Sequence, residues 1–157
     1  MDCVGYLIDG ATGHLDNDKP RMVKTPWSDD AIPFEDAAEI GTQKVISEHS
    51  TIGIVMTIDT DLARSAYVAA EERVVEELKS LGKPFVVILN SKVPDSAETV
   101  KLGKALTEKY NTPVLPIDVL NMGEDDITGL FKEVLMEFPL RDIEVKLNKW
   151  LQALPPE

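Results

Sequence analysis

The sequence has very little cysteine and no long apolar run, and each absence excludes a class of protein. A single cysteine, Cys3, excludes an internal disulfide and fits a reducing compartment, so the cytoplasm is the expected location. No apolar stretch approaches the roughly 18 residues that a membrane-spanning helix needs. Residues 1–5 lack a basic segment followed by an apolar one, so a signal peptide is not expected.

Positive charge is also scarce. The 157 residues contain 16 basic and 28 acidic side chains, which gives a formal net charge of −12. That charge repels a phosphate backbone, and the basic residues are scattered along the chain rather than clustered. Nucleic acid is therefore not an expected partner, although an acidic surface can also serve solubility alone.

The phosphate-binding pattern G-x-x-x-x-G-K-[ST] is missing as well. Gly10 and Gly13 have no following lysine and are interpreted as part of a loop. His14 and His49 do not have the spacing of metal ligands. Cys3 has no second cysteine or basic partner, so it is assigned to packing within a strand.

Three short apolar runs rich in valine and isoleucine stand out, at residues 51–58, 84–89 and 113–119. Their hydrophobicity is continuous rather than alternating, which is typical of strands covered on both faces. Amphipathic helical patterns lie around them. The predicted helices cover residues 34–46, 67–81, 95–110 (with Asp95 and Glu98 as a capping box) and 127–138 after an acidic first turn. Alternating strands and helices predict an α/β fold with a parallel sheet.

Two regions fall outside this pattern. Residues 9–33 contain several glycines, prolines and charges, and are predicted to form a long loop. Residues 141–147 alternate like a strand, and residues 150–156 resemble a linker. We therefore expect one domain over residues 1–138, with residues 139–157 starting a following domain or a linker.

In parallel sheets ligands bind beyond the carboxyl ends of the strands. The polar residues expected there are Asp59, Asp61, Asn90, Ser91, Lys92, Asp118 and Asn121. Candidate binding residues should be found among these side chains.

Asp2-Cys3-Val4-Gly5 fits the D-x-x-G turn that ends the third strand of a GTPase-type domain. In that turn the aspartate holds Mg²⁺ through a water molecule, and the glycine N–H approaches the γ-phosphate. Asp2 is therefore the candidate catalytic and metal-positioning residue, and Gly5 a candidate nucleotide-binding residue. The order of elements favours this reading, since a helix and three strand–helix units follow.

The base-reading motif N-K-x-D of such domains would follow the strand at residues 84–89. Asn90-Ser91-Lys92-Val93 stands there, with Ser91 in place of the lysine and Val93 in place of the aspartate. Valine cannot accept the hydrogen bonds of guanine, so ATP or a weak base preference is expected. Asn90, Ser91 and Lys92 are the candidate nucleotide-binding residues of this loop.

Several segments together resemble the stage IV sporulation protein A family. They are residues 19–27 (KPRMVKTPW), 32–34 (IPF), 37–42 (AAEIGT), 48–53 (EHSTIG), 70–74 (AEERV), 82–85 (GKPF) and 108–110 (EKY). The resemblance covers nearly the whole chain, yet a minor part of the full family protein. It implies a P-loop NTPase domain of GTPase-like fold, truncated before the third strand, so that the P-loop and first strands precede the chain.

The resemblance further implies function. The family protein hydrolyses ATP with Mg²⁺ and self-assembles into the basement layer of the bacterial spore coat, in the mother cell at the forespore surface. It implies as partners other copies of itself, a small amphipathic membrane peptide and other coat morphogenetic proteins. The chain alone is expected to be inactive.

A second reading from another class is a non-catalytic interaction module of coat assembly. A nucleotide-dependent change in the size of the intact protein would separate the two. A phospho-receiver domain is excluded, because Val119-Leu120-Asn121 stands where that fold needs lysine and proline.

If the central strand is missing, residues 51–58 form a bare edge. The chain then self-associates through this edge, unless residues 1–33 fold back over it.

Overall fold

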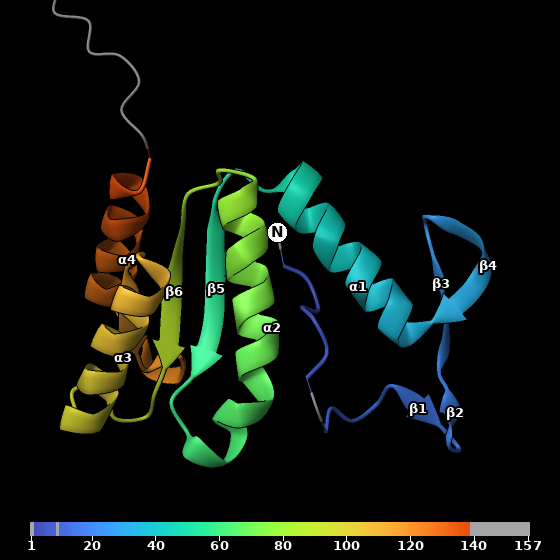
Figure 1. The fold of residues 1–157 in the computed structure, drawn as a ribbon, viewed down its shortest axis with the longest axis horizontal. Helices are drawn as coiled ribbons and strands as arrows, with labels where there is room; N and C mark the ends of the chain where they lie inside the picture. The colour runs from blue at the N-terminus through green and yellow to red at the C-terminus, as the bar shows by residue number, and fades with distance from the viewer. Residues whose placement is uncertain (1, 9, 139–157) are drawn as a thin grey trace, which may run out of the picture.

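A three-stranded parallel sheet forms the centre of the molecule (Figure 1). The computed structural model describes residues 2–8 and 10–138. The strands are β5 (Gly53–Ile58), β6 (Phe85–Asn90) and β7 (Val114–Ile117), in the order β5-β6-β7. The helices are α2 (Asp61–Ser80) between β5 and β6, α3 (Ala97–Tyr110) between β6 and β7, and α4 (Glu124–Met136) after β7. The α/β class and all three predicted strands are confirmed.

The central strand β6 is buried on both faces. Phe85, Val87 and Leu89 pack with side chains of α2 and α3, while Val86 and Ile88 pack with Leu130 and Val134 of α4. Val86, Val87 and Leu89 have no exposed surface. Successive side chains of a strand point to opposite faces, so a continuous apolar run is what two covered faces require.

The helix ends differ in part from the prediction. Ser96, and not Asp95, caps α3, because its hydroxyl accepts a hydrogen bond from the Thr99 N–H at 3.1 Å. The predicted capping box is therefore wrong. Asn111 ends α3 in the left-handed region, as expected from its position. Helix α2 begins at Asp61, earlier than the predicted residue 67.

Residues 9–33 were predicted to be a loop, and this is wrong for most of the region. It contains two antiparallel hairpins, which pair β1 (Leu15–Asp16) with β2 (Lys19–Pro20) and β3 (Met22–Thr25) with β4 (Ser28–Pro33). Asn17 and Asp18 both have positive φ, which suits the tight turn between β1 and β2. The strands are short and carry many charges, so they lack the apolar pattern that indicates a strand.

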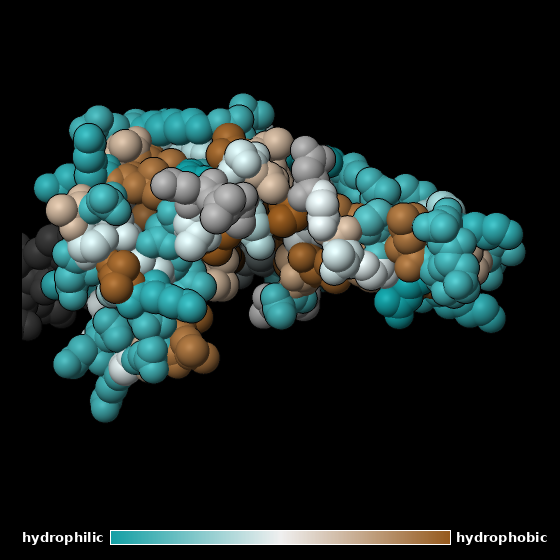
Figure 2. All heavy atoms as spheres, turned by 90° about the horizontal axis from the view of Figure 1, so that it is seen from below, coloured by the Kyte–Doolittle hydropathy of each residue, from teal (hydrophilic) through white to brown (hydrophobic). Residues whose placement is uncertain are grey.

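The hairpins lie at the far end of an arm formed by α1 (Phe34–Lys44), away from the sheet (Figure 1). Much of their surface is hydrophilic (Figure 2). Trp27 packs on α1, where a Cβ added to Gly41 would lie 3.4 Å from the Trp27 ring. A larger residue at position 41 would press on that ring.

Helix α1 continues into one π-helical turn, Val45–His49, and Lys83 closes its carboxyl end. The Lys83 ammonium donates to the carbonyl oxygens of Ser47 at 2.9 Å and Ser50 at 2.7 Å, and also to that of Ile46. The last carbonyls of a helix have no partner within the helix, and a cation there also interacts favourably with the helix dipole. Lys83 therefore joins the end of α1 to the segment before β6.

We expect Lys83→Met to lower the free energy of unfolding by about 2 kcal/mol, since hydrogen bonds to a charged group contribute roughly 1.5–3 kcal/mol. Urea denaturation followed by circular dichroism measures this. The control is Lys79→Met, an exposed lysine on α2, which should change the free energy by no more than about 0.5 kcal/mol. Equal effects of the two substitutions would contradict the capping role.

No helix within the described residues has the length and hydropathy to cross a membrane. The strand-like pattern at 141–147 and the linker-like residues 150–156 lie outside the described residues.

Candidate functional site

The side chain of Asn90 connects the carboxyl ends of β6 and β7. Asn90 is the last residue of β6, and its Oδ1 accepts a hydrogen bond from the Val119 N–H at 3.2 Å. The N–H of Ser91 donates to the carbonyl of Ile117 at 3.1 Å. These bonds hold the loop after β6 against the loop after β7. The side-chain amide oxygen of Asn90 is thus occupied in holding these two loops together.

Ser91 is also structural. It is buried, and its hydroxyl accepts from the Val93 N–H at 3.0 Å and lies 3.3 Å from the Thr99 hydroxyl. The Thr99 hydroxyl donates to Asp59 Oδ2 at 2.9 Å. The chain of contacts joins the ends of β5 and β6 to the start of α3. Of the three residues predicted for the base loop, Lys92 has the exposed side chain.

Asp118 shapes the loop after β7. Its carboxylate accepts from the N–H groups of Leu120 (3.1 Å) and Asn121 (3.3 Å) and from the Asn121 side-chain amide at 2.7 Å. The bond from the Asn121 side chain, followed by smaller contributions that include the charge of Lys92, lowers the pKa of Asp118 below its ordinary value. The expected gathering of polar groups at the carboxyl ends of the strands is confirmed for Asp59, Asn90 and Asp118.

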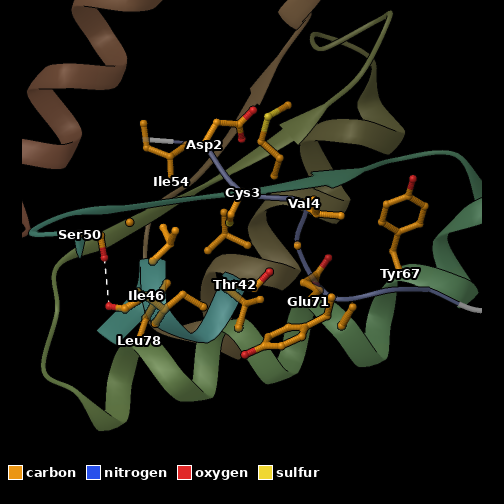
Figure 3. Close-up of a pocket in the computed structure, with 18 of the residues that line it drawn as sticks. Asp2, Cys3, Val4, Thr42, Ile46, Ser50, Ile54, Tyr67, Glu71 and Leu78 are labelled. Carbon is orange, nitrogen blue, oxygen red and sulfur yellow. Dashed lines mark hydrogen bonds between the residues drawn. The ribbon is translucent and has the colours of Figure 1, made fainter. Parts of the chain in front are cut away.

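A hollow of about 500 Å³ opens beside β5, away from β6 and β7 (Figure 3). Residues 2–6 and 8 form one wall, and β5 and the helices α1 and α2 supply the others. Its surface is mostly apolar, with the hydroxyl of Thr42 as an exception. Thr42 Oγ1 is buried and has no hydrogen-bond partner among residues 2–8 and 10–138.

Asp2 and Gly5 both line this hollow. Asp2 is exposed, and Gly5 has φ +81°, a conformation that favours glycine. A Cβ at Gly5 would meet nothing within 4 Å, so the backbone angle and not the space requires glycine here. Cys3 is exposed, and residues 2–8 form neither strand nor helix. The assignment of Cys3 to strand packing is wrong, because Cys3 is exposed and does not belong to a strand.

The structure does not bring Asp2 together with Asn90. Asp2 shares the hollow with Ser50 and Ile54, near the amino end of β5. Asn90 is level with Ile58 at the opposite end of that strand. Ile58 lies four positions along the strand from Ile54, which is about 13 Å at ~3.3 Å per residue. The described residues therefore hold two separate groups of candidate residues.

The segment with Asp2 and Gly5 is anchored by Tyr6. The Tyr6 hydroxyl donates to Glu77 at 2.5 Å, and the Arg73 guanidinium lies 3.9 Å from the centre of the Tyr6 ring. Arg73 also forms ion pairs with Glu39 of α1 and Glu77 of α2. Burial, then the bond to Glu77, raises the pKa of Tyr6 well above its ordinary value, so it stays a neutral donor.

Sequence reasoning missed a buried ion pair under β5. Arg64 binds Glu71 through two hydrogen bonds of 3.1 and 2.9 Å, and also donates to Thr57 Oγ1 at 3.1 Å. Tyr110 donates its hydroxyl to the same Glu71, whose exposure is 5%. Burial alone would raise the pKa of Glu71, but the hydrogen bonds led by that from Arg64 lower it below the ordinary 4.5. The seven-residue spacing of Arg64 and Glu71 on one helix was the available signal.

The side chains around Asp2 show whether a Mg²⁺ ion would fit there. Asp2 offers the hard carboxylate oxygen that Mg²⁺ prefers, and no cation pairs with it among the described residues. Within the same residues no group of three or more His, Cys, Asp or Glu could hold a metal ion. Asp2 thus supplies a single oxygen ligand, and the described residues do not assemble a complete metal site around it.

Comparison with known proteins identifies what the chain resembles. Residues 1–139 match the family model described as stage IV sporulation protein A, ATPase domain. The chain is 52% identical to Stage IV sporulation protein A of Clostridioides difficile (strain 630) and 50% identical to that of Bacillus subtilis (strain 168). Each comparison covers 98% of this chain and 32% of the relative, so the chain spans about a third of the length of these relatives. No solved structure matches it.

Proposed function

The chain belongs to the stage IV sporulation protein A family, and on this premise we propose that it is part of an ATP-hydrolysing protein that assembles the basement layer of the spore coat. The match of residues 1–139 to the family's ATPase domain carries the proposal. The parallel sheet with helices on both faces is compatible with a GTPase-like P-loop domain.

Two residues of the N-terminal segment have proposed roles in hydrolysis. ATP with Mg²⁺ supplies the phosphoanhydride bond that water cleaves. Asp2 would supply a carboxylate to hold the Mg²⁺ ion, and Gly5, with no side chain, would let its N–H approach the γ-phosphate. Tyr6 fixes the backbone next to Gly5 through Glu77.

The loops after β6 and β7 are proposed to meet the base. Asn90 and Ser91 hold these loops in place, and Lys92 is exposed beside them. Val93, with 60% of its surface exposed, stands where a guanine-specific site needs a carboxylate. The arrangement therefore supports contact with a purine without selection for guanine.

Location and partners follow from the family and belong to the same proposal. The protein acts in the mother cell at the forespore surface, where it binds other copies of itself, a small amphipathic membrane peptide and other coat morphogenetic proteins. The test uses the full-length family protein carrying this sequence. ATP with Mg²⁺ should increase its sedimentation coefficient through assembly, and no change with ATP would contradict the proposal in favour of a non-catalytic interaction module.

The 157-residue chain by itself is expected to show no ATP hydrolysis above a blank. It has no amide cradle or lysine of the P-loop type to neutralise a triphosphate, and its charge of −12 opposes binding. Phosphate release measured with and without Mg²⁺ tests this. Turnover that depends on Mg²⁺ and disappears in Asp2→Ala would contradict it.

The full-length family protein carrying this sequence is expected to tolerate either purine. Because Val93 replaces the carboxylate that binds guanine, ATP should compete at least equally with GTP. Competition binding with a labelled nucleotide measures the ratio. A preference for GTP of a hundredfold, which equals about 2.7 kcal/mol, would contradict the assignment of this loop.

A further inference from the structure

The side chain of Arg73 contacts three separate parts of the molecule. Its Nη2 donates to Glu39 of α1 at 2.6 Å, and its Nε donates to Glu77 of α2 at 3.3 Å. The guanidinium carbon lies 3.9 Å from the centre of the Tyr6 ring. A guanidinium can make these contacts together because it is planar, with N–H groups along its edge and a flat face that stacks on an aromatic ring. One side chain therefore joins the N-terminal segment, α1 and α2.

Glu77 closes a ring of contacts around Tyr6. One carboxylate oxygen of Glu77 accepts from Arg73, and the other accepts from the Tyr6 hydroxyl at 2.5 Å. Arg73 thus holds the ring of Tyr6, and Glu77 holds its hydroxyl. Two contacts at different points of one rigid side chain fix both its place and its tilt. Because Gly5 directly precedes Tyr6, the same contacts limit where the Gly5 N–H can lie.

The contact with Glu39 fixes the direction of what we term the hairpin arm, residues 15–44. Within the described residues, Glu39 is the outermost position of α1 that a hydrogen bond or ion pair joins to α2. Lys83 binds the carbonyl of Ile46, seven residues or about 10 Å farther along the same helix. A rod that is held at two points keeps its direction, whereas a rod held at one point can pivot. The Arg73–Glu39 pair is thus the second point that directs α1 and its hairpins (Figure 1).

These contacts act on geometry more than on stability. The side chains of Arg73 and Glu39 are 42% and 45% exposed, and ion pairs of such exposure contribute little to the free energy of unfolding. Without Arg73, the carboxylates of Glu39 and Glu77 would face position 73 with no cation between them, and like charges repel. The chain would still fold, but α1 would lean away from α2, and Tyr6 would lose the partner of its ring.

We propose that Arg73 is a positioning residue that sets the direction of the hairpin arm and the place of the Gly5 N–H together. The inference rests on the proposed function, in which that N–H approaches the γ-phosphate. Turning α1 displaces Glu39 and with it Arg73, which carries Tyr6 along. A molecule that binds the hairpins and turns the arm would therefore change the rate of hydrolysis. Nucleotide bound at Gly5 would in turn change the preferred direction of the arm, since coupling between two binding events is reciprocal.

The direction of the arm can be measured in the 157-residue chain without nucleotide. Spin labels are attached through Asp29→Cys on β4 and Lys104→Cys on α3, both exposed positions, in a Cys3→Ser background. Double electron–electron resonance then gives the distribution of distances between the labels. Arg73→Lys keeps the charge but loses the planar group, and it should widen this distribution at least twofold. The control is Lys109→Met, which breaks a similarly exposed ion pair between α3 and α2 and should leave the width unchanged.

Hydrolysis by the full-length family protein carrying this sequence tests the effect on Gly5. Arg73→Lys should lower kcat by about tenfold and leave the KM for ATP within about twofold, because a misplacement of about 1 Å acts on the reacting geometry more than on ground-state binding. Glu39→Gln should also lower kcat. Glu39 lies on the arm and binds Arg73, so its effect would reach Gly5 through that residue.

An unchanged distribution of distances in Arg73→Lys would overturn the proposal. A wild-type kcat in both Arg73→Lys and Glu39→Gln would overturn it as well, because the arm and the Gly5 N–H would then be independent. If the wild-type full-length protein does not hydrolyse ATP, the proposed function fails by itself. The distances between the spin labels, measured without nucleotide, still decide whether Arg73 directs the arm.

Discussion

Replacing Glu71 with glutamine is expected to lower the free energy of unfolding by about 3 kcal/mol, at the low end of the 3–5 kcal/mol found when one partner of a buried ion pair is removed. Glutamine keeps the shape and one acceptor, but it leaves the charge of Arg64, 14% exposed, without its partner. Tyr110 also loses a charged acceptor. Urea denaturation of the 157-residue chain measures the change.

The neighbouring residue provides the control. Glu72 pairs with Lys109 at 2.5 Å, but both side chains are more than 40% exposed, so the pair is screened by water. Glu72→Gln should change the free energy of unfolding by less than about 1 kcal/mol. Similar losses for the two variants would show that burial does not strengthen the Arg64–Glu71 pair.

The same ion pair gives a pH dependence with a definite sign. The pKa of Glu71 is lower in the folded chain than its ordinary 4.5. Its stabilising contribution is therefore fully present above pH 4.5 and is lost as the pH falls through the folded pKa. The difference in stability between the wild-type chain and Glu71→Gln should shrink below pH 4.5, which urea titrations at several pH values can follow. A difference that grows with acid would contradict the lowered pKa.

In the full-length family protein, Asp2→Asn is expected to slow ATP hydrolysis by 10- to 100-fold, the usual cost of removing a group that acts on a metal through its outer shell. The amide has about the same size and keeps hydrogen bonding, but it loses the negative charge that orients the metal-bound water. The requirement for Mg²⁺ should rise in parallel. Initial rates across a Mg²⁺ titration measure both quantities.

An aspartate of the hairpins serves as the control for Asp2. Asp30 is exposed on β4, and its change to asparagine removes the same negative charge. Asp30→Asn should leave the rate within about twofold of wild type, since exposed charges contribute little. An unchanged rate and Mg²⁺ requirement in Asp2→Asn would remove Asp2 from the proposed site.

The sheet could be predicted from the sequence because each strand is a short apolar run. The burial of β6 on both faces needs continuous hydrophobicity, and Phe85, Val87 and Leu89 supply it on one side. The polar residues after the strands were also found, since parallel strands place their carboxyl ends together. Asn90 and Asp118 do occupy this end, where they build the loops.

The features that could not be predicted depend on contacts between distant residues. The hairpins carry charge where strands normally carry apolar residues, and so they resembled a loop. The choice of Ser96 over Asp95 as the cap of α3 is decided by one hydroxyl that reaches the Thr99 N–H. The burial of Glu71 depends on Tyr110, 39 residues away, which no local pattern reveals. The position of Asp2 likewise depends on what lies beside β5.

The contacts of Lys83 also determine how motion can pass through the molecule. Lys83 directly precedes β6, and its ammonium binds the carbonyl oxygens of Ser47 and Ser50, which precede β5. The lysine therefore holds together the two ends of the segment 51–82, which includes β5 and α2. The β3–β4 hairpin leads directly into the amino end of α1, at the other end of the same helix (Figure 1). A partner that pulled on the hairpins would therefore transmit its force along α1 to the amino ends of β5 and β6 together. The arm and the sheet are mechanically connected at that point.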